Sequence, residues 1–167
     1  MSLDYEIFDW DVKSVADIRR TFQSYSGTPE FIQTVVKNLR NGEGQNGAGW
    51  LLKSWFESGE TVDAEQTSKI IAAFHSTESW ETRLHMLQCL PYLTIPHNRK
   101  FAVEDFVRDS LKEKNKFVRA WAYNGLYELA KQHPEYQAEA TALFEVAIQQ
   151  ESASVKARIR NILKKGF

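Results

Sequence analysis

Two side chains that could do nucleophilic chemistry lie one helical turn apart in the middle of the chain. His85 and Cys89 are spaced i, i+4, so both would lie on one side of a helix. A catalytic Cys–His pair also needs a third, orienting group and an exposed, electropositive setting. Cys89 instead adjoins Leu90, where an apolar core is expected, and free cysteine is among the most buried residue types. We therefore interpret Cys89 as a core residue and predict no catalytic residue, which favours a protein without enzymatic activity.

Metal and cofactor motifs are also missing from the sequence. The four histidines are scattered, without an H-E-x-x-H motif or a cysteine cluster, so no metal site is specified. A literal G-x-G-x-x-G begins at Gly42, but it follows a helical pattern, whereas a dinucleotide site requires a preceding strand. We interpret residues 41–50 as a flexible connection that ends where Ala48 and Gly49 pack closely against another helix. We expect no cofactor and no metal.

The bulk composition describes one globular domain spanning 1–167. The chain is 43% hydrophobic and 13% aromatic, with a formal net charge of -1. This balance argues against a dedicated nucleic-acid binder, for which a strongly basic surface is expected. The single cysteine excludes an internal disulfide framework and fits a reducing compartment, so we expect a cytoplasmic protein. No apolar run is long enough to span a bilayer, and we expect no membrane partner.

The charge is unevenly distributed along the chain. From Ser152 to the end there are five basic residues and no acidic one. We interpret this end as a solvated last helix, whose cations are favoured near the helix C-terminus. A basic binding surface at this end is the alternative.

A sequence pattern recurs at a nearly fixed spacing and indicates helical repeats. A basic residue precedes a leucine by seven positions in Arg83–Leu90, Arg119–Leu126 and Lys156–Leu163, with offsets of 36 and 37 residues. A period of this size is typical of a helical solenoid, in which each helix pair buries its apolar face against its neighbours. No segment alternates with period two for long enough to be a strand. The sequence therefore predicts an all-α fold, with its clearest repeats in 76–167.

By their helical spacing, the three basic repeat residues lie on the same side of the helix as the core residues and not on the exposed side. We expect Arg83, Arg119 and Lys156 to bond to carbonyls or acids of the preceding turn and so to connect one repeat to the next. Phosphate binding is the alternative for these residues.

Helix boundaries follow from capping residues and from the spacing of apolar residues. Ser14 and Asp17 form a capping box at one helix start, Thr28 with Pro29 begins the next helix, and Ser154 caps the last one. The remaining helices are expected at about 49–59, from Thr61 or Asp63, and at 80–93, 99–112, 117–132 and 134–150. Residues 1–13 are acidic and aromatic without clear periodicity, and we expect an irregular arm there.

The shared register predicts which side chains stack from repeat to repeat. On the second helix of each pair, positions off the apolar stripe carry amides, an indole, an imidazole and a guanidinium. The predicted strip consists of His85, Gln88, Tyr92, Trp121, Asn124, Glu128, Arg158 and Asn161. If these helices line a concave face, the strip would suit an extended peptide or a polar segment of a partner protein. The alternative is that Trp121 belongs to the core and that the amides are solvated.

The repeat pattern resembles that of HEAT-like repeat proteins. The resemblance covers 76–167 clearly and 28–75 weakly, and the Asp that usually precedes the second helix is replaced by Ser79, Asn115 and Ser152. It implies a right-handed α-α superhelix of the HEAT/armadillo type. Within this class, STESWETRLHMLQCL and KNKFVRAWAYNGLYELAKQHPEY are similar to segments of the DNA-alkylation-repair glycosylases.

That second resemblance implies an aromatic concave groove, basic residues along DNA and an Asp on an earlier inner helix. The corresponding segment here, GAGWLLKSWFE, contains Trp50 and Trp55 but no Asp before Glu57, so no catalytic residue is transferred. We expect a non-catalytic scaffold that binds a protein or peptide through the strip. The alternative is a nucleic-acid-binding protein related to those glycosylases.

Overall fold

The fold is entirely α-helical, as predicted. A computed structural model describes all residues, 1–167, and contains helices but no strand. The α-helices are α1 Leu3–Asp9, α2 Val15–Tyr25, α3 Phe31–Asn38, α4 Gln45–Glu57, α5 Ala64–Ala72, α6 Trp80–Cys89, α7 Lys100–Leu111, α8 Lys116–Gln132, α9 Gln137–Gln150 and α10 Ala153–Lys165. No helix combines the length and the apolar character that crossing a bilayer requires.

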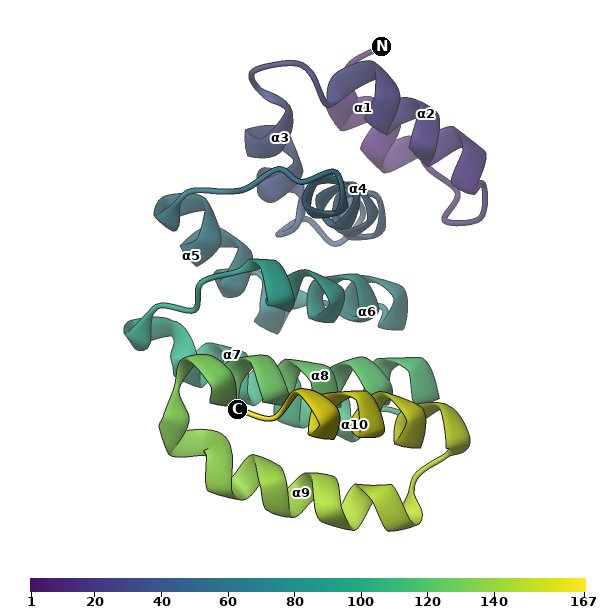
Figure 1. Cartoon of the computed structure of the whole chain (residues 1–167). Coiled ribbons are helices and arrows are strands. Elements are labelled where there is room, and N and C mark those ends of the chain that lie inside the picture. Colours follow the sequence, from purple (N-terminus) through teal and green to yellow (C-terminus); the bar gives the residue numbers. More distant parts are fainter.

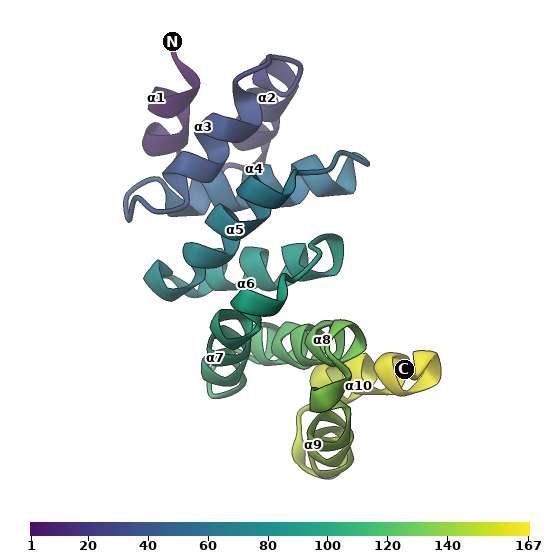
Figure 2. The ribbon, with the colours of Figure 1, turned by 90° about the vertical axis from the view of Figure 1, so that its left-hand side faces the viewer.

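The helices are arranged as a stack. From α4 onwards, each even-numbered helix contacts the next even-numbered helix. α4 contacts α6, α6 contacts α8, and α8 contacts α10, so these four form one row. In both views the row runs from α4 down to α10 (Figures 1 and 2), and α3, α5 and α7 line up beside it in the same order. α1 and α2 lie at one end of the stack, and α9 and α10 lie at the other.

The core follows the apolar stripe that the repeats predict. Val118, Ala122 and Leu126 of α8 are at most 2% exposed, and α8 packs against α6, α7, α9 and α10. Leu90, the counterpart of Leu126 in the preceding repeat, is also fully buried. The counterpart in α10, Leu163, is 46% exposed, because α10 lies at the end of its row.

Most predicted helix starts are confirmed, two are wrong by two residues, and α4 begins four residues earlier than predicted. Ser14 Oγ accepts from the Asp17 amide at 3.2 Å. Thr28 was expected to begin the third helix, but its hydroxyl donates to the Tyr25 carbonyl at 2.8 Å and so completes the turn after α2. The last helix is preceded by Ser152 rather than by Ser154.

The prediction of an irregular arm at 1–13 is wrong for its first part. α1 is a helix that begins after Ser2, whose hydroxyl accepts from the Tyr5 amide at 3.3 Å. Leu3 and Ile7, spaced i, i+4, are buried against the rest of the molecule. Two apolar positions are too few for a periodic signal, and tertiary packing supports a helix this short.

Residues 41–50 were predicted to be a flexible connection, but only 41–44 form a turn and 45–50 already belong to α4. The helix starts at Gln45, earlier than expected, so Gly47 and Gly49 lie within its first turns. A Cβ at Gly47 would lie 2.9 Å from the Ile7 carbonyl oxygen of α1. A Cβ at Gly49 would lie 3.4 Å from the His85 Cβ of α6. The predicted close packing at Gly49 is therefore confirmed, and the glycines let α4 approach α1 and α6.

Candidate functional site

One pocket is lined by all four helices of the α4–α6–α8–α10 row. It has a volume of about 290 Å³ and is lined by Lys53 and Glu57 of α4, Gln88 of α6, Pro91 and Tyr92 of the following 3₁₀ turn, Trp121, Asn124 and Glu128 of α8, and Arg158 and Lys165 of α10. We call it the four-helix pocket. Three basic and two acidic side chains line it.

Two aromatic side chains give the pocket rigid walls. The Arg158 guanidinium carbon lies 4.1 Å from the centroid of the Trp121 ring, a cation–π contact that leaves the edges of the guanidinium free to donate. Tyr92 is 50% exposed, and its inner face stacks on Phe56 with ring centroids 5.2 Å apart. Each ring is thus held from one side, which orders it without the help of a ligand.

Two polar groups of the pocket are poorly satisfied within the chain. The Gln88 Oε1 atom is buried and has no hydrogen-bond partner. Glu128 is 7% exposed, and its closest cation is the Lys131 Nζ atom at 3.8 Å. Burial raises the pKa of the Glu128 carboxyl, while Lys131 and Lys165 oppose the shift. Buried polar groups without partners are uncommon in folded proteins and mark a position where a ligand could supply them.

The cations of the pocket differ in how they are paired. Lys53 Nζ lies 2.8 Å from Glu57 Oε1 within α4. Arg158 and Lys165 form no ion pair, and the same holds for Lys156, Arg160 and Lys164, so α10 has five basic side chains without an acidic partner. The unpaired positive charge of the pocket therefore comes from α10.

The structure brings six of the eight predicted strip residues into one pocket. These are Gln88, Tyr92, Trp121, Asn124, Glu128 and Arg158. Trp121 is only partly buried, whereas Asn124 is 5% exposed and reaches the pocket from below its surface. Asn161 is exposed on α10 outside the pocket. His85 faces α4 instead, and burial lowers its pKa to about 4.

The sequence pattern missed the contribution of α4 to this pocket. Lys53 and Glu57 are spaced i, i+4 on that helix, and such spacing is a signal of an ion pair on one helical face. The recurring basic residue is absent from α4, so the repeat pattern gives no register that would place Lys53 and Glu57 on the strip.

The structure agrees with the interpretation of Cys89 as a core residue. Its side chain is fully buried, and burial raises the pKa of the thiol. A thiol held in its neutral form is a poor nucleophile.

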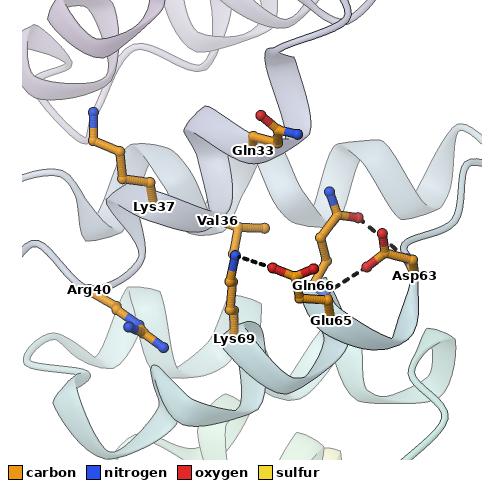
Figure 3. Close-up of a pocket in the computed structure, with 8 residues that line it drawn as sticks. All are labelled: Gln33, Val36, Lys37, Arg40, Asp63, Glu65, Gln66 and Lys69. Carbon is orange, nitrogen blue, oxygen red and sulfur yellow. Dashed lines mark hydrogen bonds and ion pairs between the residues drawn. The ribbon is translucent and has the colours of Figure 1, made fainter.

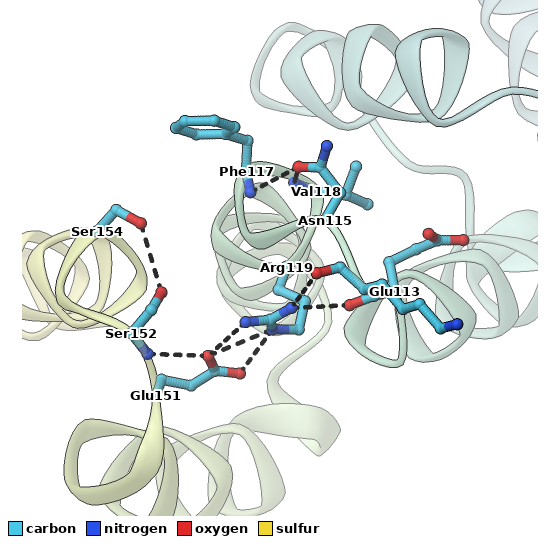
Figure 4. A network of polar contacts seen from close by, with 9 residues as sticks. Glu113, Asn115, Phe117, Val118, Arg119, Glu151, Ser152 and Ser154 are labelled. Atoms are coloured by element: carbon cyan, nitrogen blue, oxygen red, sulfur yellow. Dashed lines mark hydrogen bonds and ion pairs between the residues drawn. The ribbon is translucent and has the colours of Figure 1, made fainter.

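Two of the three repeated basic residues connect neighbouring elements, as predicted, but only Arg119 does so through carbonyls of the preceding turn. Arg119 donates to both Glu151 carboxylate oxygens and to the carbonyls of Glu113 and Lys114, at 2.8–3.3 Å (Figure 4). Arg83 donates to Ser110 Oγ at 3.0 Å and lies over the Phe106 ring. Lys156 forms no ion pair. The two arginines are structural because their donors are directed to groups of the same chain.

A second pocket lies between α3 and α5. It measures about 430 Å³, and only one of its eight lining residues is hydrophobic (Figure 3). Most of its charged groups already have partners. Lys69 pairs with Glu65 at 2.8 Å, Lys37 pairs with Asp4 of α1 at 3.3 Å, and Asp63 caps α5. Arg40 remains without an ion pair. The pocket has no aromatic wall and no unsatisfied buried group, so the four-helix pocket is the better candidate.

Comparisons with protein-family models, with curated proteins and with solved structures find no match for this chain.

Proposed function

We propose that the chain is a HEAT-like helical-repeat scaffold that binds a protein or peptide segment in the four-helix pocket. The overall form would be a right-handed superhelix of the HEAT/armadillo type, in which α4, α6, α8 and α10 are the inner helices. Three features support it: the repeat offsets of 36 and 37 residues, the ordered contacts along that row, and the arginines that tie successive repeats. Extended inner surfaces of such stacks are used for binding.

The observation that carries the proposal is the partly exposed Trp121 at the centre of the pocket. It has amide and charged neighbours from three other helices. A rigid aromatic surface surrounded by polar groups is the composition that recognises peptides, since the ring supplies contact area and the amides fix the backbone. No cofactor or metal is required for this function.

A peptide selection tests this function. Random peptides displayed on phage are selected on the wild-type protein and then tested on Trp121→Ala and on Phe101→Ala. Phe101 is 64% exposed on α7, outside the pocket. We expect selected peptides that keep their affinity for Phe101→Ala and lose it for Trp121→Ala. Peptides that lose affinity only for Phe101→Ala, or that bind both variants equally, would contradict the proposal.

A second function is favoured by the unpaired cations of α10. Five basic side chains on one helix, without an acidic neighbour in sequence, could bind nucleic-acid phosphates. The test is a titration of labelled duplex and single-stranded DNA at low and at higher salt. This function predicts salt-sensitive binding that is weakened in both Arg158→Ala and Arg160→Ala. Absence of binding at low salt would eliminate it.

A further inference from the structure

We infer that the four-helix pocket recognises an acidic side chain, Asp or Glu, of a partner peptide, and that Arg158 is its main anchor. The inference rests on the proposed function and specifies the chemistry of the partner.

The first argument is the geometry of Arg158. The Arg158 guanidinium carbon lies 4.1 Å from the centroid of the Trp121 ring, and the guanidinium has no carboxylate partner in the chain. A planar, pre-oriented guanidinium binds a carboxylate through two parallel hydrogen bonds. The two arginines of the repeat ladder have already used their donors on Ser110 and Glu151. Arg158 has not, and it lies in a pocket rather than between repeats.

The second argument is the charge of the surroundings. Lys165 lines the same pocket without an ion pair, and three further unpaired cations lie on α10. Together they favour the approach of an acidic segment and raise its association rate. Lys53 contributes less, because Glu57 neutralises it at 2.8 Å.

The third argument separates an acidic peptide from a nucleic acid. Glu57 and Glu128 line the pocket together with the cations, and these two carboxylates would repel a closely spaced row of phosphates. A single carboxylate can instead pair with Arg158 or Lys165, the two pocket cations that have no ion pair. Gln88 and Asn124 also line the pocket and supply amide groups to it.

The test uses three acetylated, amidated peptides of equal length that differ only in their central residues, which are Glu, Gln or Lys. Binding is followed by the indole ¹H–¹⁵N signal of Trp121, assigned with Trp121→Phe. We expect the Glu peptide to shift this signal and the Gln and Lys peptides to bind at least about tenfold more weakly, as expected for loss of a charged hydrogen-bonded partner.

Four variants locate the interaction. Arg158→Gln should weaken binding of the Glu peptide by about tenfold or more, and Arg158→Lys should weaken it less, because it keeps the charge but loses the planar fork. Arg160→Gln removes the same charge from the exposed face of α10 and should stay within about twofold. Glu128→Gln should tighten binding, since it removes a repelling carboxylate. Thermal unfolding followed by circular dichroism identifies any variant that has lost its fold.

The outcomes separate this inference from the proposed function. Preference for the Gln or Lys peptide at Trp121 would overturn the inference and leave peptide binding intact. Equal losses in Arg158→Gln and Arg160→Gln, or stronger competition by single-stranded DNA than by the Glu peptide, would overturn it in favour of general polyanion binding. If no peptide shifts the Trp121 signal, both the inference and the proposed function fail.

Discussion

In two regions of the stack, a side chain near the start of a helix binds the segment that leads to the next helix of the row, but the two side chains use different chemistry. Near the N-terminal end of α4, Gln45 Nε2 donates to the Ser76 carbonyl at 2.5 Å, and Gln45 Oε1 accepts from the Glu78 amide at 3.1 Å. Near the N-terminal end of α8, the guanidinium of Arg119 binds Glu151 and two carbonyls. Both side chains tie one helix of the α4–α6–α8–α10 row to the segment that precedes the next helix of that row, one through a neutral amide and the other through a charge.

The difference teaches which structural roles a sequence pattern can reveal. Arg119 recurs with Arg83 and Lys156 at the same repeat position, so its structural role could be predicted from the sequence alone. Gln45 stands in a glycine-rich segment without a counterpart in later repeats, and nothing in its neighbourhood marks it. Its role depends on burial to 2% beside a turn that lies 31 residues ahead.

Breaking the charged connection should have the largest effect. Arg119→Met leaves Glu151 and two carbonyls without their donors, and we expect the free energy of unfolding to fall by about 2–4 kcal/mol. Lys156→Met, at the equivalent repeat position without an ion pair, should change it by less than about 0.5 kcal/mol. Urea unfolding of both variants measures the difference, and equal effects would show that Arg119 is no structural tie.

Breaking the neutral connection should cost less. Gln45→Ala removes the partner of the Ser76 carbonyl and of the Glu78 amide, two part-buried hydrogen bonds, which should lower the free energy of unfolding by about 1–3 kcal/mol. The exposed Gln23 of α2 provides a matched glutamine, and Gln23→Ala should be within about 0.5 kcal/mol of wild type. A loss for Gln45→Ala no larger than for Gln23→Ala would contradict the role given to this amide.

The close approach of the α4 backbone at Gly47 to the α1 backbone gives a third test of the region around the start of α4. Gly47→Ala places a Cβ 2.9 Å from the Ile7 carbonyl oxygen and should destabilise the fold by about 1–3 kcal/mol through overpacking. A Cβ at Gly27 meets no atom within 4 Å, so Gly27→Ala should be neutral or slightly stabilising. Thermal unfolding compares the two, and a neutral Gly47→Ala would show that α1 can move away from α4 at little cost.

The stability contributed by the contact between α4 and α6 should also depend on pH. The connection made by Arg119 should not, because arginine keeps its charge throughout. Burial lowers the pKa of His85 from its ordinary 6.5 to about 4. Below the ordinary value the unfolded chain binds a proton that the folded chain does not, so stability is present above pH 6.5 and is lost as pH falls towards 4. Between pH 7 and 5 this loss should be about 1–2 kcal/mol.

A histidine pair of variants isolates this contribution. His85→Gln should flatten the dependence of the unfolding free energy on pH between 7 and 5, whereas His75→Gln, at an exposed position, should leave it as in wild type. An unchanged dependence in His85→Gln would exclude His85 as its source.

The helices and most of the pocket could be predicted because both depend on periodic or local signals. The spacing of Val118, Ala122 and Leu126 identifies the core face of α8, and the same register places Trp121 and Arg158 on a common strip. Three features could not be predicted: the helix α1, the early start of α4 and the contribution of Lys53 to the pocket. Each depends on contacts between distant segments, such as Ile7 with Gly47, and these leave no local pattern.

The most direct test of the proposed binding site is photo-crosslinking with a peptide from the phage selection. A photoreactive phenylalanine derivative is placed at Tyr92, in the pocket, or at Phe101, on α7; both wild-type side chains are exposed, by 50% and 64%. The proposal predicts that the peptide crosslinks from position 92 and not from position 101, and that Trp121→Ala abolishes the crosslink. Crosslinking from position 101 alone, or equally from both, would contradict binding in the four-helix pocket.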